Sequence, residues 1–382
     1  MTCNQRTALR RSPRQALAAM LVMCCAALHA QDKPRGALPP VTITAHPSDP
    51  VVKSYRQMVR GMDYFEAMHA LAPQAPLRFK LLPRRRETDM DRIDLAISGP
   101  GFDIPVPIAP DHTFTLPRNQ QALDEDAVVT PNRKKQSMTW RTEIRTPGWP
   151  AGTRRLGDLR LECQVGLESG LVSNANGLLG RIARLFSNSR GYCDRKQARY
   201  LFFAERPAFG VTLVAGERRE TVSVDRLYAA ASDDPHWRED LPYCDCEVLV
   251  DRTYFLPLGD ASWPDDTRVE FEYMEDADGG STSTPLAALE AIAPGARSKA
   301  EVQGLLGKPV IVPFDNGFEV WVYRGNGGTD GKPVASELVL LFDPSGEVRK
   351  SRLRSGEAQL SVRPEPVEGL AWASTGSART DK

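Results

Sequence analysis

The first strongly patterned stretch of the chain runs from Asp49 to Leu71. Asp49-Pro50 is typical of a helix start, because an N-cap residue is followed by proline at the first helical position. The pattern predicts a helix that either packs on its own domain or offers a methionine-rich surface to a partner, and the first use is the commoner one. Its apolar face would consist of Val51, Tyr55, Met58, Met62, Phe65 and Met68.

From Leu77 to about Leu167 the apolar period falls to two, as in strands with one buried face. Short runs separated by Pro, Gly and Asp predict a β-sandwich-like region. Basic clusters at Arg84–Arg86 and Arg133–Lys135 could hold an anionic headgroup or a glycan, although charged loops are usually just solvated. The predicted strands are Leu77–Leu82, Ile93–Ser98, Ile104–Ile108, Thr113–Leu116, Ser137–Arg141 and Leu156–Val165.

A second β-rich region extends to about Met274. It opens with a turn at Asn174–Gly177 and a predicted helix at Leu178–Phe186. Acidic and glycine-rich residues at 275–283 then predict a linker. The strand-like runs of this region are Arg199–Ala204, Gly210–Ala215, Glu220–Val224, Glu247–Phe255 and Arg268–Met274.

The clearest pattern lies near the end of the chain. Leu286–Ile292 predicts a short helix, and the capping box Ser298-Lys299-Ala300-Glu301 starts a second one that Gly307 ends. Turn signals at Asp315–Gly317 and Asp343–Gly346 separate strand-like runs, of which the last is polar. These runs are Val310–Phe314, Phe318–Tyr323, Glu337–Phe342 and Glu347–Arg354.

Alternation along these strands leaves a second apolar face besides the one that the two helices need. Val320 and Val322 would point to one side of the sheet. The opposite side carries more apolar surface than a solvated sheet normally has. Something must cover it, either the chain's own β-rich regions or another protein. This predicted partner surface consists of Trp321, Tyr323, Val339 and Leu341.

Three motifs occur in order in this part of the chain: Leu306-Gly307-Lys308-Pro309, Phe318-Glu319-Val320-Trp321-Val322-Tyr323 and Phe342-Asp343-Pro344-Ser345-Gly346-Glu347-Val348. On these residues, 284–354 resembles the SmpA/OmlA (BamE-like) envelope domain. The resemblance implies an α+β unit of two helices and a three-stranded antiparallel sheet in the periplasm. It also implies that the unit acts by binding partners and not by catalysis.

The first 30 residues have the layout of a secretory signal, which predicts an exported protein that is periplasmic or associated with the outer membrane. The alternatives are an uncleaved anchor or a misassigned start. The apolar run Ala16–Ala27 is too short to span a bilayer comfortably. Cys24 follows Met23, where a lipoprotein signal normally has a small residue, so lipidation of Cys24 stays open. The other features are Arg6, Arg10, Arg11 and Arg14 at the start and Leu28-His29-Ala30 before a cleavage point at Gln31.

The charge balance argues against nucleic acid as a partner. The chain carries 49 basic and 49 acidic side chains, and cleavage after Ala30 would remove four arginines and no acidic residue. The mature chain would therefore be slightly acidic, without the concentrated basic face that nucleic-acid binding needs. We expect unidentified envelope proteins as partners.

Four of the seven cysteines lie outside the signal: Cys163, Cys193, Cys244 and Cys246. An even number in an oxidising compartment indicates two disulfides. Cys244 and Cys246 are too close in sequence to pair with each other, so we expect each of them to join Cys163 or Cys193 and staple the middle of the chain. A four-thiolate zinc site is the alternative, but Cys-x-Cys is poor zinc spacing.

No catalytic, cofactor-binding or metal-binding motif emerges from the sequence. Gly166-Leu167-Glu168-Ser169-Gly170 lacks the spacing of a serine-nucleophile elbow, and the histidines are scattered singly. Asp111-His112 could approach a metal, as could His236 with Asp233, Asp234 and Glu239, although a lone histidine beside acids is usually solvated.

We therefore predict a non-catalytic accessory or scaffold protein of α+β, multidomain architecture. Two alternatives stay open. The first is a proteinaceous inhibitor of a hydrolase, because the small α+β fold is similar to that of β-lactamase-inhibitor proteins. The second is an enzyme whose site lies in the β-rich regions. The expected boundaries are 1–30 (signal), 31–48 (linker), 49–167 (helix and β-sandwich-like domain), 168–274 (β-rich domain with disulfides), 275–283 (linker), 284–354 (BamE-like module) and 355–382 (disordered tail).

Overall fold

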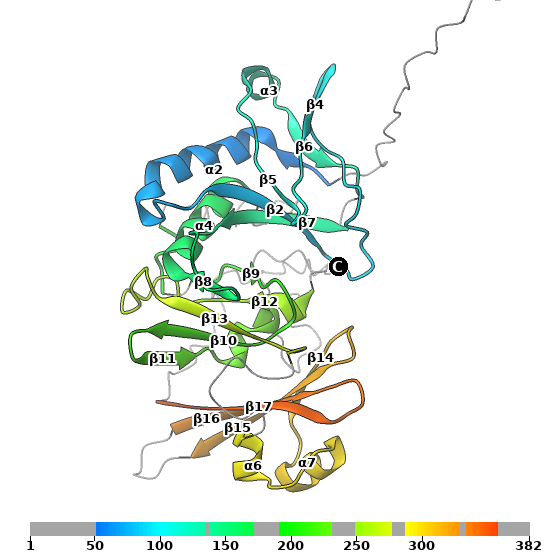
Figure 1. Cartoon of the computed structure of the whole chain (residues 1–382), viewed down its shortest axis with the longest axis vertical. Helices are drawn as coiled ribbons and strands as arrows, with labels where there is room; N and C mark the ends of the chain where they lie inside the picture. Colours follow the sequence, from blue (N-terminus) through cyan, green and yellow to red (C-terminus); the bar gives the residue numbers. More distant parts are fainter. Residues whose placement is uncertain are drawn as a thin grey trace, which may run out of the picture. The chain divides into compact units, whose positions relative to one another are not determined.

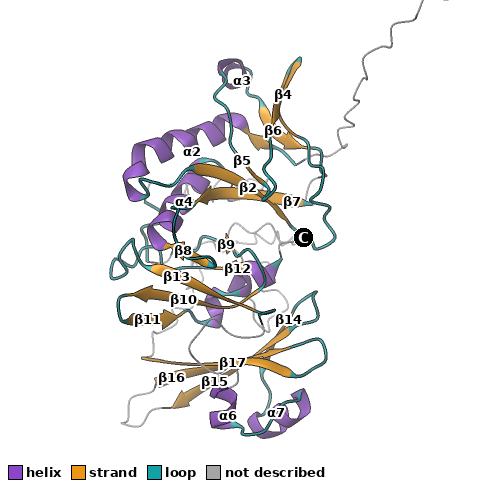
Figure 2. Ribbon diagram, in the orientation of Figure 1, coloured by secondary structure: helices purple, strands orange, loops and turns teal. Residues whose placement is uncertain are grey.

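Several antiparallel sheets and a few helices make up the folded part of the chain (Figures 1 and 2). The computed structural model describes residues 51–134, 137–171, 191–196, 198–230, 249–276, 287–327 and 334–357, all of which belong to one compact unit. The predicted signal (1–30), the linker at 31–48, the helix Leu178–Phe186, and Cys244 and Cys246 lie outside the described residues.

Two sheets and a helix form the N-terminal part of this unit. One sheet has the strand order β1-β6-β3-β4 and the other the order β5-β2-β7. Both sheets share a hydrophobic core with α2 (Tyr55–Met68), which includes Tyr55, Met58, Ile97 and Trp140. The remaining bounds are β1 Lys53–Ser54, β2 Leu77–Pro83, β3 Leu95–Gly99, β4 Phe102–Val106, β5 Thr113–Phe114, α3 Gln120–Asp124, β6 Val128–Pro131 and β7 Met138–Ile144, with a 3-10 turn η1 at His69–Leu71.

The helix α2 begins later than the sequence pattern predicts. Ser54, and not Asp49, is its N-cap, and the Ser54 hydroxyl accepts a hydrogen bond from the backbone N–H of Gln57. The residues before it are held as a strand, because Lys53 and Ser54 pair with β6. Tyr55, Met58 and Val59 of α2 face the shared core and Phe65 faces a second cluster, which supports the interpretation of this helix as one packed on its own domain.

The predicted strand Leu156–Val165 is instead part of the helix α4 (Leu156–Glu168). The reason is that α4 is buried on two sides. Leu159, Cys163 and Leu167 follow a spacing of four and belong to one hydrophobic cluster, while Leu161 and Val165 belong to another. Two helical stripes offset by two residues look like strand alternation in the sequence, so the prediction was wrong.

The middle of the chain adds a four-stranded antiparallel sheet of order β11-β10-β13-β8 and a two-stranded one formed by β9 and β12. Several predicted strands in this part are shorter than expected. The bounds are β8 Thr153–Arg155, β9 Phe202–Phe203, β10 Ala208–Ala215, β11 Arg218–Thr221, β12 Thr253–Tyr254 and β13 Arg268–Tyr273, with 3-10 turns η2 Val224–Arg226, η3 Tyr228–Ala230 and η4 Val250–Arg252. One of its strands, β8, lies before residue 167, so this sheet crosses the predicted boundary between the first two domains.

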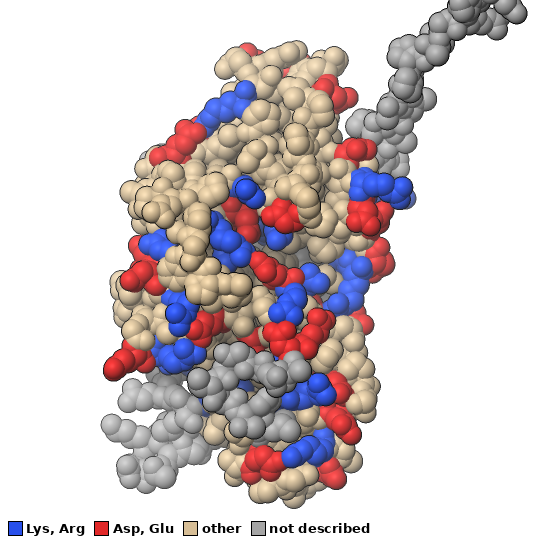
Figure 3. All heavy atoms as spheres, viewed as in Figure 1, with Lys and Arg blue, Asp and Glu red and all other residues tan. Residues whose placement is uncertain are grey.

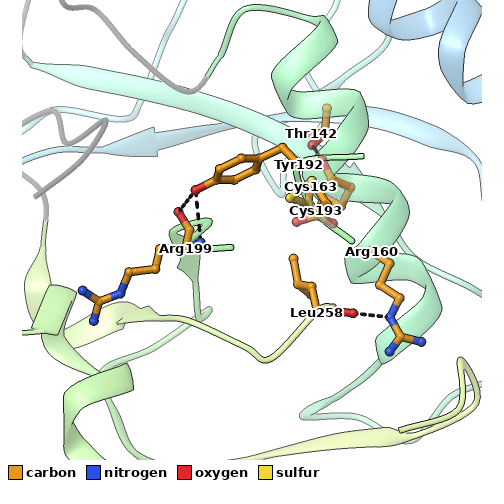
Figure 4. The surroundings of a disulfide bond; sticks show 8 residues. Thr142, Arg160, Cys163, Tyr192, Cys193, Arg199 and Leu258 are labelled. Carbon is orange, nitrogen blue, oxygen red and sulfur yellow. Dashed lines mark hydrogen bonds between the residues drawn. A yellow bond between two sulfur atoms is a disulfide. The ribbon is translucent and has the colours of Figure 1, made fainter. Parts of the chain in front are cut away.

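One disulfide joins Cys163 on α4 to Cys193, 30 residues further along (Figure 4). This pairing corrects the expectation that both cysteines join Cys244 or Cys246. Cys163 and Cys193 are both buried in the same hydrophobic cluster, so helix packing brings them together. Hydrogen bonds hold the surroundings: Arg160 Nε donates to the carbonyl of Leu258 (2.8 Å), and the backbone N–H of Arg199 donates to the Tyr192 hydroxyl (3.1 Å) (Figure 4).

The C-terminal part contains two short helices and a four-stranded antiparallel sheet of order β14-β15-β16-β17, one strand more than the resemblance implies. The capping box at Ser298 is confirmed, with reciprocal hydrogen bonds between Ser298 and Glu301. Gly317 and Gly346 have φ of 84° in the two tight turns, a conformation that glycine adopts without strain. The bounds are α6 Ala287–Ile292, α7 Lys299–Leu306, β14 Val310–Pro313, β15 Glu319–Gly327, β16 Val334–Phe342 and β17 Val348–Glu357, so β17 ends three residues inside the predicted tail.

Candidate functional site

The predicted partner surface is divided between the two faces of the C-terminal sheet. In the pairing of β15 with β16, Leu340 lies opposite Trp321, so Trp321 and Tyr323 point to the face on which α6 and α7 pack (Figure 1). Val339 and Leu341 point to the other face. The prediction that the four residues share one face is wrong, because alternation within a strand does not fix the register between strands.

Both faces are covered by the chain itself. Trp321 is 3% exposed and packs on the Phe342 ring, with 4.5 Å between the ring centroids. Tyr323 is half-buried, and its hydroxyl donates to the carbonyl of Gly307 (3.3 Å). Val339 and Leu341 are fully buried in a hydrophobic cluster that also contains residues of β10. Three of the four residues predicted as a partner surface are therefore core residues, and the fourth, Tyr323, packs against the core.

A cavity of about 730 Å³ lies beside the sheet β5-β2-β7. This volume lies in the range of small-molecule sites, about 300–1,000 Å³. Its walls come from β2 and β7, from α4, from the segment 145–153 and from the segment 200–205 around β9. The cavity combines charged side chains with aromatic ones, and we call it the β2–β7 cavity.

A buried ion pair lies at the α4 wall of this cavity. Arg154 on β8 donates from Nη2 to the Glu162 carboxylate (2.7 Å) and to the carbonyl of Ile144 (2.9 Å). Both charged side chains are 6% exposed. The backbone N–H of Ile144 also donates to Glu162 (3.1 Å). The pair thereby fastens α4 to β7 and β8.

Two further carboxylates of the cavity share one arginine. Arg145 contacts Glu143 (3.0 Å) and Glu205 (3.0 Å), and so connects β7 to the segment that follows β9. Burial alone would raise the pKa of Glu143, but Arg154, Arg145 and Lys80 outweigh burial and hold this pKa below its ordinary value. Glu143 is therefore ionised at neutral pH.

Glu162 behaves in the opposite way. Burial raises its pKa to about 7 against the attraction of Arg154, and the charge of Glu143 adds to the increase. In the unfolded chain the same carboxyl would titrate near its ordinary value of 4.5. Between these two values the folded protein holds a proton that the unfolded chain has released.

The stability of the protein is therefore expected to fall as the pH rises from about 4.5 to about 7, by up to about 3 kcal/mol from Glu162 alone. This contribution is fully present below the unfolded pKa and is lost above the folded one. Urea unfolding at pH 5 and pH 7.5 measures it, and Glu162→Gln removes the titrating group. An equal pH dependence in the wild type and the Glu162→Gln variant would contradict the assignment.

Asp111 and His112, singled out in the sequence, lie at the edge of the β2–β7 cavity but face different partners. The Asp111 carboxylate accepts hydrogen bonds from the hydroxyl (2.7 Å) and the backbone N–H (3.1 Å) of Thr113, which lower its pKa. A ring nitrogen of His112 lies 3.1 Å from the carbonyl of Met90. His236 and the acids around it lie outside the described residues.

The charged residues of the cavity were not predicted from the sequence. A signal was present, because Arg78 and Lys80 alternate with apolar residues on one strand and Arg141 and Glu143 do so on another. Such alternation alone does not distinguish a solvated face from the wall of a cavity. Only the pairing of β2 with β7 shows that the four side chains share a face.

No family model, curated protein or solved structure matches the chain. Within the described ranges, no group of three or more His, Cys, Asp or Glu side chains could hold a metal ion. No helix in that part of the chain is long and apolar enough to span a membrane. On the face shown in Figure 3, basic and acidic side chains are interspersed.

Proposed function

We propose that this chain is a non-catalytic, exported protein of the cell envelope, an accessory or scaffold that binds envelope proteins through a BamE-like module at 284–354. The observation that carries the proposal is the architecture of residues 287–357: two short helices, the second with a capping box, lie on one face of an antiparallel sheet (Figure 2). This is the arrangement that the resemblance implies, extended by one strand.

The finer organisation belongs to the same proposal. We take the two sheets around α2 as a β-sandwich-like domain, the disulfide-linked middle as a second β-rich domain and the C-terminal unit as the binding module. The shared core of the first two sheets supports the first assignment. The separate cluster around Trp321 and Leu340 supports the last one.

The partner surface of the module must differ from the one predicted from the sequence. Leu305 at the end of α7 is 64% exposed, and Ile311 on β14 is 41% exposed. Ile311 pairs with Trp321 and so lies on the helix-bearing side of the sheet. Because β14 is an edge strand, its outer backbone groups can pair with an added strand. An apolar, edge-forming segment of this kind suits protein–protein binding.

Site-specific photo-crosslinking tests the binding proposal. A benzophenone amino acid at Leu305 or Ile311, in the full chain expressed in bacteria with an outer membrane, is expected to give a discrete adduct with an envelope protein. The matched control is the same probe at Met68 on α2, an apolar residue that is 39% exposed. Equal labelling at all three positions, or none at Leu305 and Ile311, would reject this surface.

Mass spectrometry of the protein from the periplasmic and membrane fractions tests export separately. The proposal expects a mature chain that begins at Gln31. A chain retained in the cytoplasm with its first 30 residues intact would rule out the envelope location, whatever the crosslinking shows.

A further inference from the structure

Two cations stand side by side on the sheet that borders the β2–β7 cavity. Lys80 of β2 and Arg141 of β7 are direct partners in the antiparallel register, so their side chains leave the same face of the sheet. Both line the cavity. Like charges opposite each other destabilise a strand pair unless an anion offsets the repulsion. A negative group inside the cavity would therefore reduce the repulsion between Lys80 and Arg141.

The carboxylates of the cavity offset this pair only in part. Glu143 and Asp111 attract Lys80 without contacting it, and each carboxylate makes its direct contacts with other groups. Glu162 is bound by Arg154, and Glu143 and Glu205 are bound by Arg145. Asp111 accepts two hydrogen bonds from Thr113 and lies 3.9 Å from a guanidinium nitrogen of Arg78. Among the described residues, the Lys80 ammonium makes neither a hydrogen bond nor an ion pair.

Of Lys80 and Arg141, Arg141 indicates an anion-binding site more strongly. Its side chain is 6% exposed, and its hydrogen bond to the described part of the chain runs from Nη1 to the carbonyl of Leu171. The Nε of Arg141 is buried without a hydrogen-bond partner among the described residues, and so is the Nε of Arg252, which also lines the cavity. A buried guanidinium without a carboxylate is costly, which makes these donors places where an acceptor would bind favourably.

Aromatic side chains also line the cavity. The Phe203 ring lies 5.4 Å from the Arg141 guanidinium carbon, and Phe202 and Trp149 also line the cavity. The buried Tyr200 hydroxyl lies beside the Thr142 hydroxyl, which donates to the carbonyl of Glu162 (2.8 Å). An occupant of this cavity would therefore carry both a negative group and an organic part.

We infer that the β2–β7 cavity binds a small organic anion, whose carboxylate or phosphate oxygens Lys80 and Arg141 hold while its organic part packs on Phe203 and Trp149. This site is independent of the partner surface proposed for the C-terminal module. Its chemistry is recognition of an oxyanion by two cations in a largely buried setting, where such hydrogen bonds are strongest.

Isothermal titration of the full chain in a buffer free of phosphate and carboxylate tests the inference, with phenyl phosphate, benzoate and benzyl alcohol as probes. We expect at least one of the two anions to bind and the neutral alcohol not to bind. Lys80→Met is expected to weaken anion binding by about tenfold or more, and Lys80→Arg to retain it. Lys196→Met, at an exposed lysine outside the cavity lining, should bind like the wild type.

Failure of the wild type to bind either anion at millimolar concentration would overturn the inference, and so would equal binding by Lys80→Met. Lys80 is half-buried and makes no direct hydrogen bond or ion pair with a described residue, so its replacement should leave the fold intact even if Arg141 variants do not fold. Flotation with phosphatidylglycerol vesicles distinguishes two sources of the anion. If the protein floats with the vesicles and Lys80→Met does not, the bound anion is a lipid headgroup. If the protein binds phenyl phosphate or benzoate but does not float, the bound anion is a soluble molecule.

Discussion

Replacing Arg154 with methionine is expected to lower the free energy of unfolding by about 3–5 kcal/mol at pH 8. Arg154 and Glu162 form a pair at 2.7 Å with both side chains 6% exposed. Without the guanidinium, the Glu162 carboxylate would stay buried with the backbone N–H of Ile144 as its remaining donor. Urea unfolding followed by circular dichroism measures the loss. The cost should be smaller at pH 5, because Glu162 already holds a proton there.

Two comparisons show whether the loss comes from the stranded charge. The double variant Arg154→Met/Glu162→Met removes both charges, so it should be closer to the wild type than the single variant. Arg206→Met breaks an ion pair with Asp276 whose side chains are 46% and 37% exposed, and it should change stability by less than about 1 kcal/mol. A double variant as unstable as Arg154→Met would mean that packing, and not charge, accounts for the effect.

Local signals in the sequence predicted the C-terminal part of the fold best. The capping box at Ser298 and the glycines at 317 and 346 act on their immediate neighbours, so their effect can be read without knowledge of the tertiary structure. Strands with one clear apolar face, such as β2 and β10, were also placed within a few residues. Each of these elements satisfies a local rule that its tertiary surroundings do not override.

Features that depend on what packs against an element were missed. The helix α4 was taken as a strand because two clusters bury it from opposite sides. The face of Val339 was misassigned because the register between β15 and β16 is a long-range property. The β2–β7 cavity was not predicted for the same reason, since Lys80 and Arg141 become neighbours only through strand pairing.

Replacing Trp321 with alanine is expected to destabilise the protein by about 3–5 kcal/mol, as for other buried aromatic residues. The indole lies between the sheet and the two C-terminal helices, packs on Phe342 and donates from Nε1 to Glu319 (3.1 Å). Truncation would open a cavity that the short helices α6 and α7 cannot fill without moving. Chemical unfolding followed by circular dichroism measures the change.

Leu305→Ala on α7 is the matched control, because Leu305 is 64% exposed and its truncation should change stability by no more than about 0.5 kcal/mol. Leu341→Ala extends the test to the other face of the sheet, where a fully buried leucine should cost about 2–5 kcal/mol. If Trp321 and Leu341 formed an exposed partner surface, both variants would unfold like the wild type and lose binding alone. The structure requires the reverse: both residues hold the module together, and a variant at Leu305 leaves the fold intact while it weakens partner binding.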